Sequence, residues 1–160
     1  MTTAQPTSPK CFFIGWMLAW ATAVYLPSLM IAALSLSPLA SAGNLLLDTF
    51  EVADEVSPAA KLTYAVLFGA LVITARVGGA RRGASIHVLI GVISIALVVA
   101  LLPEYWSRGF GIGLNGVRFD PLPTAIYAIG GVASGVVFSQ LEAKCLARSL
   151  THALDRPSDD

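Results

Sequence analysis

Charged and aromatic side chains gather between two long apolar runs, in the stretch PEYWSRGFGIGLNGVRFDPLP at 103–123. Four of them are candidates for one polar cluster: Glu104, Arg108, Arg118 and Asp120. An acid beside an arginine could bind a polar head group, because the planar guanidinium suits phosphate. The same residues could instead form a structural ion pair, since water at the edge of an apolar layer lowers the cost of charge. Both interpretations stay open from the residues alone.

A second group of carboxylates lies in LLLDTFEVADEV, residues 45–56, which has the amphipathic pattern of a helix. Its acidic face holds Asp48, Glu51 and Glu55, and its apolar side holds Leu46, Leu47, Phe50 and Ala53. The carboxylates could bind a cation, but no calcium-type loop accompanies them. We therefore expect a solvated face on a short helix that lies on a membrane surface, with no metal.

The other residues with reactive side chains form no recognised catalytic motif. His87 begins an apolar run, and the only other histidine is His152 in the C-terminal tail, so a pair of haem ligands is not expected. No nucleophile elbow, zinc-protease motif or phosphate-binding loop occurs. Cys11 and Cys145 lack metal-ligand spacing and are expected to be separate thiols in a reducing compartment. The sequence thus predicts no cofactor and no catalytic residue.

The composition indicates an integral membrane protein. The 160 residues are 56% hydrophobic and 12% charged, whereas soluble domains carry about 25% charged residues. The net charge is zero, so a general attraction to nucleic acid is not implied. The partner predicted with most support is the lipid bilayer.

Four apolar runs can each cross a ~30 Å hydrocarbon core as a helix. We predict an all-α, four-helix membrane bundle over 11–141, with a short interfacial helix in the first outer loop. The predicted spans are 11–34, 59–77, 84–102 and 122–141, between a flexible tail at 1–10 and a second tail at 142–160. The first run and Ala40-Ser41-Ala42 resemble a signal peptide, but the run exceeds the usual ~7–15 residues, so a retained anchor is favoured.

Residues at the ends and faces of these spans carry further expectations. Lys61 and Arg76 flank the second span and are expected to snorkel outward to water. Gly131 and Gly135 in the fourth span have the GxxxG spacing, which lets helix backbones approach closely and predicts a helix-packing role.

Lysine and arginine bias predicts the orientation. With the N-terminus in the cytoplasm, three basic residues lie outside: Lys61, Arg108 and Arg118. Seven lie inside: Lys10, Arg76, Arg81, Arg82, Lys144, Arg148 and Arg156. We therefore expect both termini in the cytoplasm and the loops at 35–60 and 103–123 outside, in the inner membrane of a bacterium.

The order of several short features resembles the VanZ-like family of small membrane proteins over roughly residues 12–140. These features are LSLSP at 34–38, Tyr64 with Leu67, GARR at 79–82, Glu104-Tyr-Trp-Ser107, Arg118, and Gly131 with Gly135. Ser107 stands where the family often has glutamine. The resemblance implies a link to the cell envelope and, in one branch of the family, to glycopeptide-antibiotic resistance.

Three functions remain open from the sequence. The leading hypothesis is a non-enzymatic accessory or scaffold protein of the cell envelope, related to VanZ-like proteins, whose outer loops touch other membrane proteins or lipid-linked envelope components. The first alternative is a small oligomeric transporter or channel. The second is a membrane enzyme acting on a lipid-linked phosphate or glycan, with Glu104 as acid or base and Arg118 on the phosphate.

Overall fold

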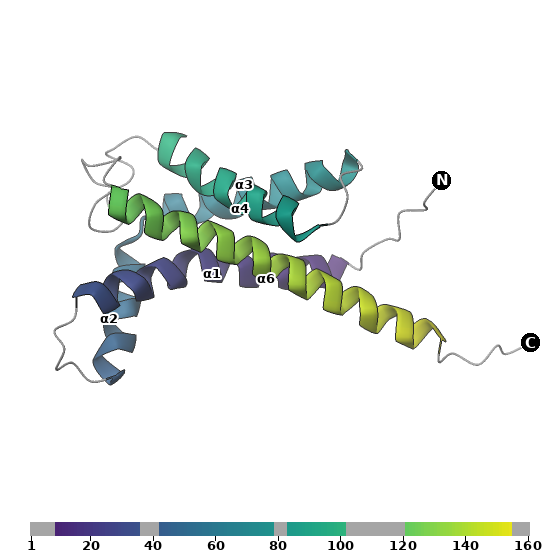
Figure 1. Ribbon diagram of the computed structural model, residues 1–160, viewed down its shortest axis with the longest axis horizontal. Coiled ribbons are helices and arrows are strands. Elements are labelled where there is room, and N and C mark those ends of the chain that lie inside the picture. Colours follow the sequence, from purple (N-terminus) through teal and green to yellow (C-terminus); the bar gives the residue numbers. More distant parts are fainter. Residues whose placement is uncertain (1–8, 36–41, 79–82, 102–120, 155–160) are drawn as a thin grey trace, which may run out of the picture.

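The computed structural model describes residues 9–35, 42–78, 83–101 and 121–154 (Figure 1). Within these ranges every regular element is a helix, which confirms the predicted all-α class. The helices are α1 (Pro9–Ser35), α2 (Ala42–Glu55), α3 (Pro58–Val77), α4 (Ala84–Leu101) and α6 (Pro121–Leu154).

Four of these helices are long and apolar enough to cross a membrane. Their membrane-length segments are Pro9–Leu34, Pro58–Val77, Ala84–Leu101 and Thr124–Cys145. The last helix differs most from its predicted span, because α6 continues without a break to Leu154. Residues 142–154 thus extend the fourth span as one continuous helix.

Helix α6 is the centre of the arrangement. It runs beside α1 along the long axis of the molecule and also packs on α4, while α3 packs on α4 and α1 (Figure 1). The largest fully buried side chains include Phe68 and Val72 of α3, Val98 of α4 and Phe138 of α6. The core therefore lies along α6, where side chains from all four long helices meet.

Glycines let α4 and α6 pack backbone against backbone. A Cβ atom added at Gly91 would collide with the backbone oxygen of Gly131, and one added at Gly135 would collide with the backbone of His87. Membrane helices associate through this kind of close packing, because lipid provides little hydrophobic drive between them. Gly131 and Gly135 thus lie against a helix of the same chain.

Two tryptophans join α1 to α3 by hydrogen bonds. Trp16 Nε1 donates to the carbonyl oxygen of Ala65 at 2.9 Å, and Trp20 Nε1 donates to that of Lys61 at 3.0 Å. The two indoles are four residues apart and so lie on one face of α1. They act inside the bundle, as polar links between helices.

Helix α2 has three distinct sides and is steeply inclined to α1 (Figure 1). The side against the bundle holds the buried residues Thr49 and Ala53, and Val56, which directly follows the helix, is buried as well. A neighbouring side exposes Leu46, Leu47 and Phe50. The remaining side carries Asp48, Glu51 and Glu55, of which Asp48 is half-buried and the two glutamates are exposed. Most of the predicted apolar face is therefore exposed, and the Phe50 ring meets that of Tyr25 on α1 with the ring centres 5.7 Å apart.

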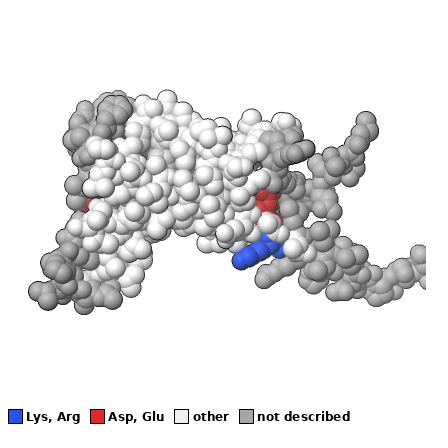
Figure 2. Space-filling model, in the orientation of Figure 1, with Lys and Arg blue, Asp and Glu red and all other residues white. Residues whose placement is uncertain are grey.

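The outside of the bundle is apolar. The face shown in Figure 2 is uncharged over most of its length, and the coloured charges appear near its two ends. Large apolar side chains such as Phe13, Val66 and Leu89 are exposed on α1, α3 and α4. A surface of this kind is stable in hydrocarbon and not in water, which agrees with a bilayer as the surroundings.

Candidate functional site: a buried ion cluster

The four residues of the predicted polar cluster, Glu104, Arg108, Arg118 and Asp120, lie outside the described residues. The predicted acidic face, Asp48, Glu51 and Glu55, is present on α2. No group of three or more histidine, cysteine or acidic residues is arranged to hold a metal ion in the part of the chain that the structure describes.

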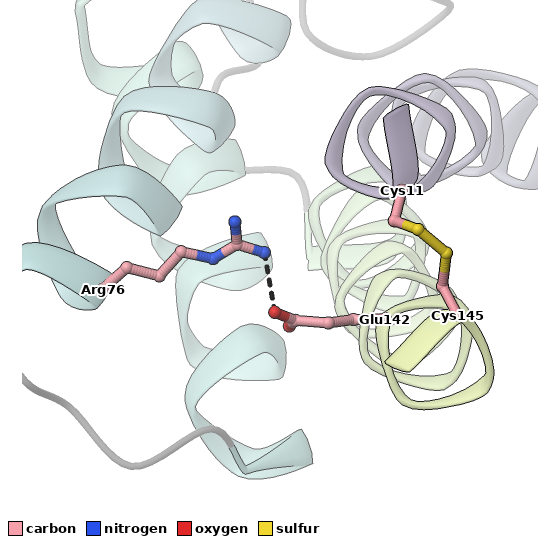
Figure 3. Close-up of a disulfide and its surroundings, with 4 residues drawn as sticks. All are labelled: Cys11, Arg76, Glu142 and Cys145. Carbon is pink, nitrogen blue, oxygen red and sulfur yellow. Dashed lines mark hydrogen bonds and ion pairs between the residues drawn. A yellow bond between two sulfur atoms is a disulfide. The ribbon is translucent and has the colours of Figure 1, made fainter. Parts of the chain in front are cut away.

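A different set of charges meets inside the bundle at the end opposite α2. Arg76, in the last turn of α3, donates from Nη2 to Oε1 of Glu142 on α6 at 2.8 Å (Figure 3). The two side chains are 19% and 7% exposed. The prediction that Arg76 snorkels outward is wrong, because a carboxylate of the neighbouring helix lies within reach on the inside.

His87 completes this cluster from a third helix. Its Nε2 lies 3.5 Å from Oε2 of Glu142, and its side chain is 6% exposed. The imidazole lies edge-on to the ring of Phe138, with the ring centres 5.0 Å apart. Each carboxylate oxygen of Glu142 thus faces a nitrogen from a different helix, so that one residue of α6 links α3 and α4.

Aromatic rings surround the guanidinium of Arg76. Its Cζ lies 4.7 Å from the centre of the Phe12 ring and 5.6 Å from that of Phe138. A cation over an aromatic face gains about 0.5–2 kcal/mol, with more where water is excluded. Because Phe12 belongs to α1, the cluster contacts all four long helices.

A hydrogen-bonded chain lies deeper in the bundle. Ser134 Oγ donates to the carbonyl oxygen of Gly131 at 2.8 Å, and the hydroxyl of Tyr64 lies 2.5 Å from Ser134 Oγ. Since the serine proton is used on Gly131, the tyrosine is the donor to serine. This chain joins α3 to α6 where the backbone of α6 lies against α4.

Cys11 and Cys145 form a disulfide beside the ion cluster (Figure 3). Their Cα atoms are 6.0 Å apart, and the bond joins the start of α1 to α6. Glu142 and Cys145 are three residues apart on α6, and Figure 3 shows them directed to different neighbours, α3 and α1. The expectation of two separate thiols is wrong in this structure, because helix packing brings residues from opposite ends of the chain together.

The sequence held a partial signal for this site. Arg76, His87 and Glu142 each stand within a few residues of the end of an apolar run, where an outward direction is equally compatible with the pattern. The alternation of crossing directions places these three ends on the same side of the membrane. The topology therefore predicts that the three residues lie on one side of the membrane. It does not predict that their side chains point into the bundle, because that depends on how each helix is rotated about its own axis.

The arrangement defines a class of protein: the chain is a small multi-pass membrane protein with an α-helical bundle. No protein-family model, no curated protein and no solved structure matches the chain. The resemblance to VanZ-like proteins therefore stays a prediction.

Proposed function

We propose that the protein is a non-enzymatic scaffold or accessory subunit of a bacterial inner membrane, related to VanZ-like proteins. Both termini lie in the cytoplasm, as the positive-inside bias favours. The loops at 35–60 and 103–123 lie outside, where they contact a membrane protein or a lipid-linked envelope component.

The pairing of Arg76 and His87 with Glu142 carries this proposal. Ionisable residues inside a membrane mark a substrate path when they line a water-filled cavity. Here they lie between packed helices under aromatic rings, and they join those helices. Such a cluster supports a bundle with one fixed conformation, whose outer loops contact a partner. A transporter would instead alternate between two conformations.

The position of the glycines also favours a scaffold over an oligomeric channel. A GxxxG face such as that of Gly131 and Gly135 can join helices of different subunits as well as helices of one chain. Both glycines are buried against α4 of the same chain. The glycine face of α6 is therefore covered by α4, and an oligomeric pore would need a different surface for the contact between subunits.

A pair of substitutions tests whether the cluster has a structural role. Glu142→Met leaves the guanidinium of Arg76 without its carboxylate and should lower the free energy of unfolding by about 3–5 kcal/mol. Arg76→Met leaves Glu142 its contact with His87 and should cost less. The double variant R76M/E142M removes both charges and should unfold within about 1 kcal/mol of wild type, because a buried pair replaced by apolar residues is often neutral. Unfolding is followed by circular dichroism in mixed detergent micelles.

The same double variant separates a scaffold from a transporter. A photo-crosslinking residue at Phe50, exposed on α2, should give one defined protein or lipid adduct in cells, in wild type and R76M/E142M alike. The matched control is Leu89, which is also exposed but lies on α4 near the ion cluster. Absence of any Phe50-dependent adduct, or solute flux in proteoliposomes that R76M/E142M abolishes, would rule out the scaffold function.

A further inference from the structure

A groove opens at the contact between α1 and α6, beside the disulfide. Its volume is about 220 Å³. The lining residues are Cys11 and Ile14 from α1 and Leu141, Lys144 and Cys145 from α6. Their spacing of three or four residues places the contributions of each helix on one side. Apart from Lys144, these side chains offer carbon and sulfur.

The volume of the groove and its position along the membrane-length helices restrict what can bind in it. Pockets for whole drug-sized ligands measure about 300–1,000 Å³, so this groove suits part of a longer molecule. Ile14 and Leu141 lie within membrane-length segments, where the surrounding solvent is acyl chain. Lys144 is the penultimate residue of the segment Thr124–Cys145. Its ammonium can therefore reach the level of lipid phosphates.

The local charges favour an anionic occupant. Lys144 is exposed, as is Lys10, which directly precedes Cys11. The nearby acid on α6, Glu142, is directed toward Arg76 on α3 (Figure 3). Lys144 thus adds a positive charge at the membrane edge of the groove, and Lys10 adds a second one on the neighbouring helix.

We propose that this groove binds an anionic phospholipid. Part of one acyl chain lies between Ile14 and Leu141, and the lipid phosphate accepts hydrogen bonds from the ammonium of Lys144. This site is independent of the proposed scaffold function, because it lies on the side of the bundle and at the end away from α2.

Lipid titration of the purified full-length protein followed by native mass spectrometry tests the head-group contact. Wild type should bind one phosphatidylglycerol more tightly than phosphatidylcholine. Lys144→Gln should weaken phosphatidylglycerol binding about fivefold, the effect of one basic residue at a membrane surface. Lys61→Gln, at the other end of the bundle, is the control and should leave it unchanged. Equal binding by wild type and K144Q would overturn the proposal.

A second pair of variants tests the acyl-chain contact. Ile14→Trp fills the groove and should reduce the binding of both lipids. Leu18→Trp lies one turn further along the same face of α1, outside the groove lining, and should bind both as wild type does. Both residues are exposed, 56% for Ile14 and 46% for Leu18, so neither substitution places a tryptophan in the packed core. Wild-type phosphatidylglycerol binding by I14W would show that the groove is not the site.

Discussion

At one end of the bundle, an ion cluster and a disulfide join all four long helices, whereas at the other end α2 leaves three large apolar side chains exposed. The end with the ion cluster and the disulfide, called the closed end below, is basic in sequence and buries Arg76, His87 and Glu142. The end with α2, the open end, is acidic, with Glu51 and Glu55 exposed on α2. The contrast indicates a division of roles: one end sets the geometry of the bundle, and the other presents a surface.

The largest effect should come from separating α4 from α6 next to the closed end. Gly135→Leu would place a side chain in the backbone of His87, and no rotamer change relieves a backbone collision. We expect loss of the folded protein in detergent, measured as the monodisperse fraction in size-exclusion chromatography. Gly15→Ala is the milder comparison, because its Cβ would lie 3.3 Å from a side chain, the Phe138 ring, rather than in a backbone. A folded G135L protein would contradict the close packing.

The next effect concerns the two cysteines and the orientation of the closed end. The structure joins Cys11 and Cys145 in a disulfide. If this end of the bundle lies in a reducing cytoplasm, as proposed, the bond should be open in cells, and both thiols should react with a maleimide added at cell lysis. Mild oxidation of the purified protein should then close the bond and raise the free energy of unfolding by about 2–4 kcal/mol. Cys11→Ser removes this gain. A pair that is already oxidised in cells would place the closed end outside and reverse the orientation.

A smaller effect is expected for the hydrogen bonds that link Tyr64, Ser134 and the carbonyl of Gly131, between the two ends of the bundle. Tyr64→Phe removes the donor to Ser134 and leaves a buried hydroxyl without this bond. We expect a loss of about 1–2 kcal/mol in the free energy of unfolding. Tyr25→Phe, on an exposed tyrosine of α1, should cost less than about 0.5 kcal/mol. Equal effects of the two substitutions would contradict a structural role for the buried chain.

The smallest effect on stability should come from substitutions on α2, which instead report its position. Leu46 and Asp48 are two residues apart and thus about 200° apart around the helix. A spin label at position 46 should be relaxed mainly by oxygen, which concentrates in lipid, and one at position 48 mainly by a water-soluble nickel complex. Each label should change the free energy of unfolding by about 0.5 kcal/mol or less. The same response at both positions would exclude an interfacial helix.

The spans could be predicted because length and hydropathy decide them locally. The run from Ala84 to Leu101 has no acidic residue, lysine or arginine, and the structure forms a helix over that range. Gly131 and Gly135 predicted a close approach by their spacing alone. Their neighbours Gly91 and His87 could not be identified, because the choice of packing partner depends on contacts across the whole bundle.

The candidate site could not be predicted from the sequence, because it depends on how each helix is rotated about its own axis. An arginine near the end of a span reaches water or a neighbouring carboxylate with similar ease, and the apolar pattern is the same in both cases. Arg76 turns inward because Glu142 lies on the facing side of α6. Cys11 and Cys145 posed the same problem, since their proximity follows from α1 and α6 lying side by side.

The disulfide also has a consequence for the assembly of the protein in the membrane. It joins residues 134 positions apart and so encloses nearly the whole membrane domain in a covalent ring. During synthesis α1 leaves the ribosome before α6, so the ring can close only after α6 has been inserted. A chain that lacks its last crossing would leave the two sulfurs on opposite sides of the bilayer. The fraction of molecules that become crosslinked on oxidation would therefore measure the fraction that have completed insertion.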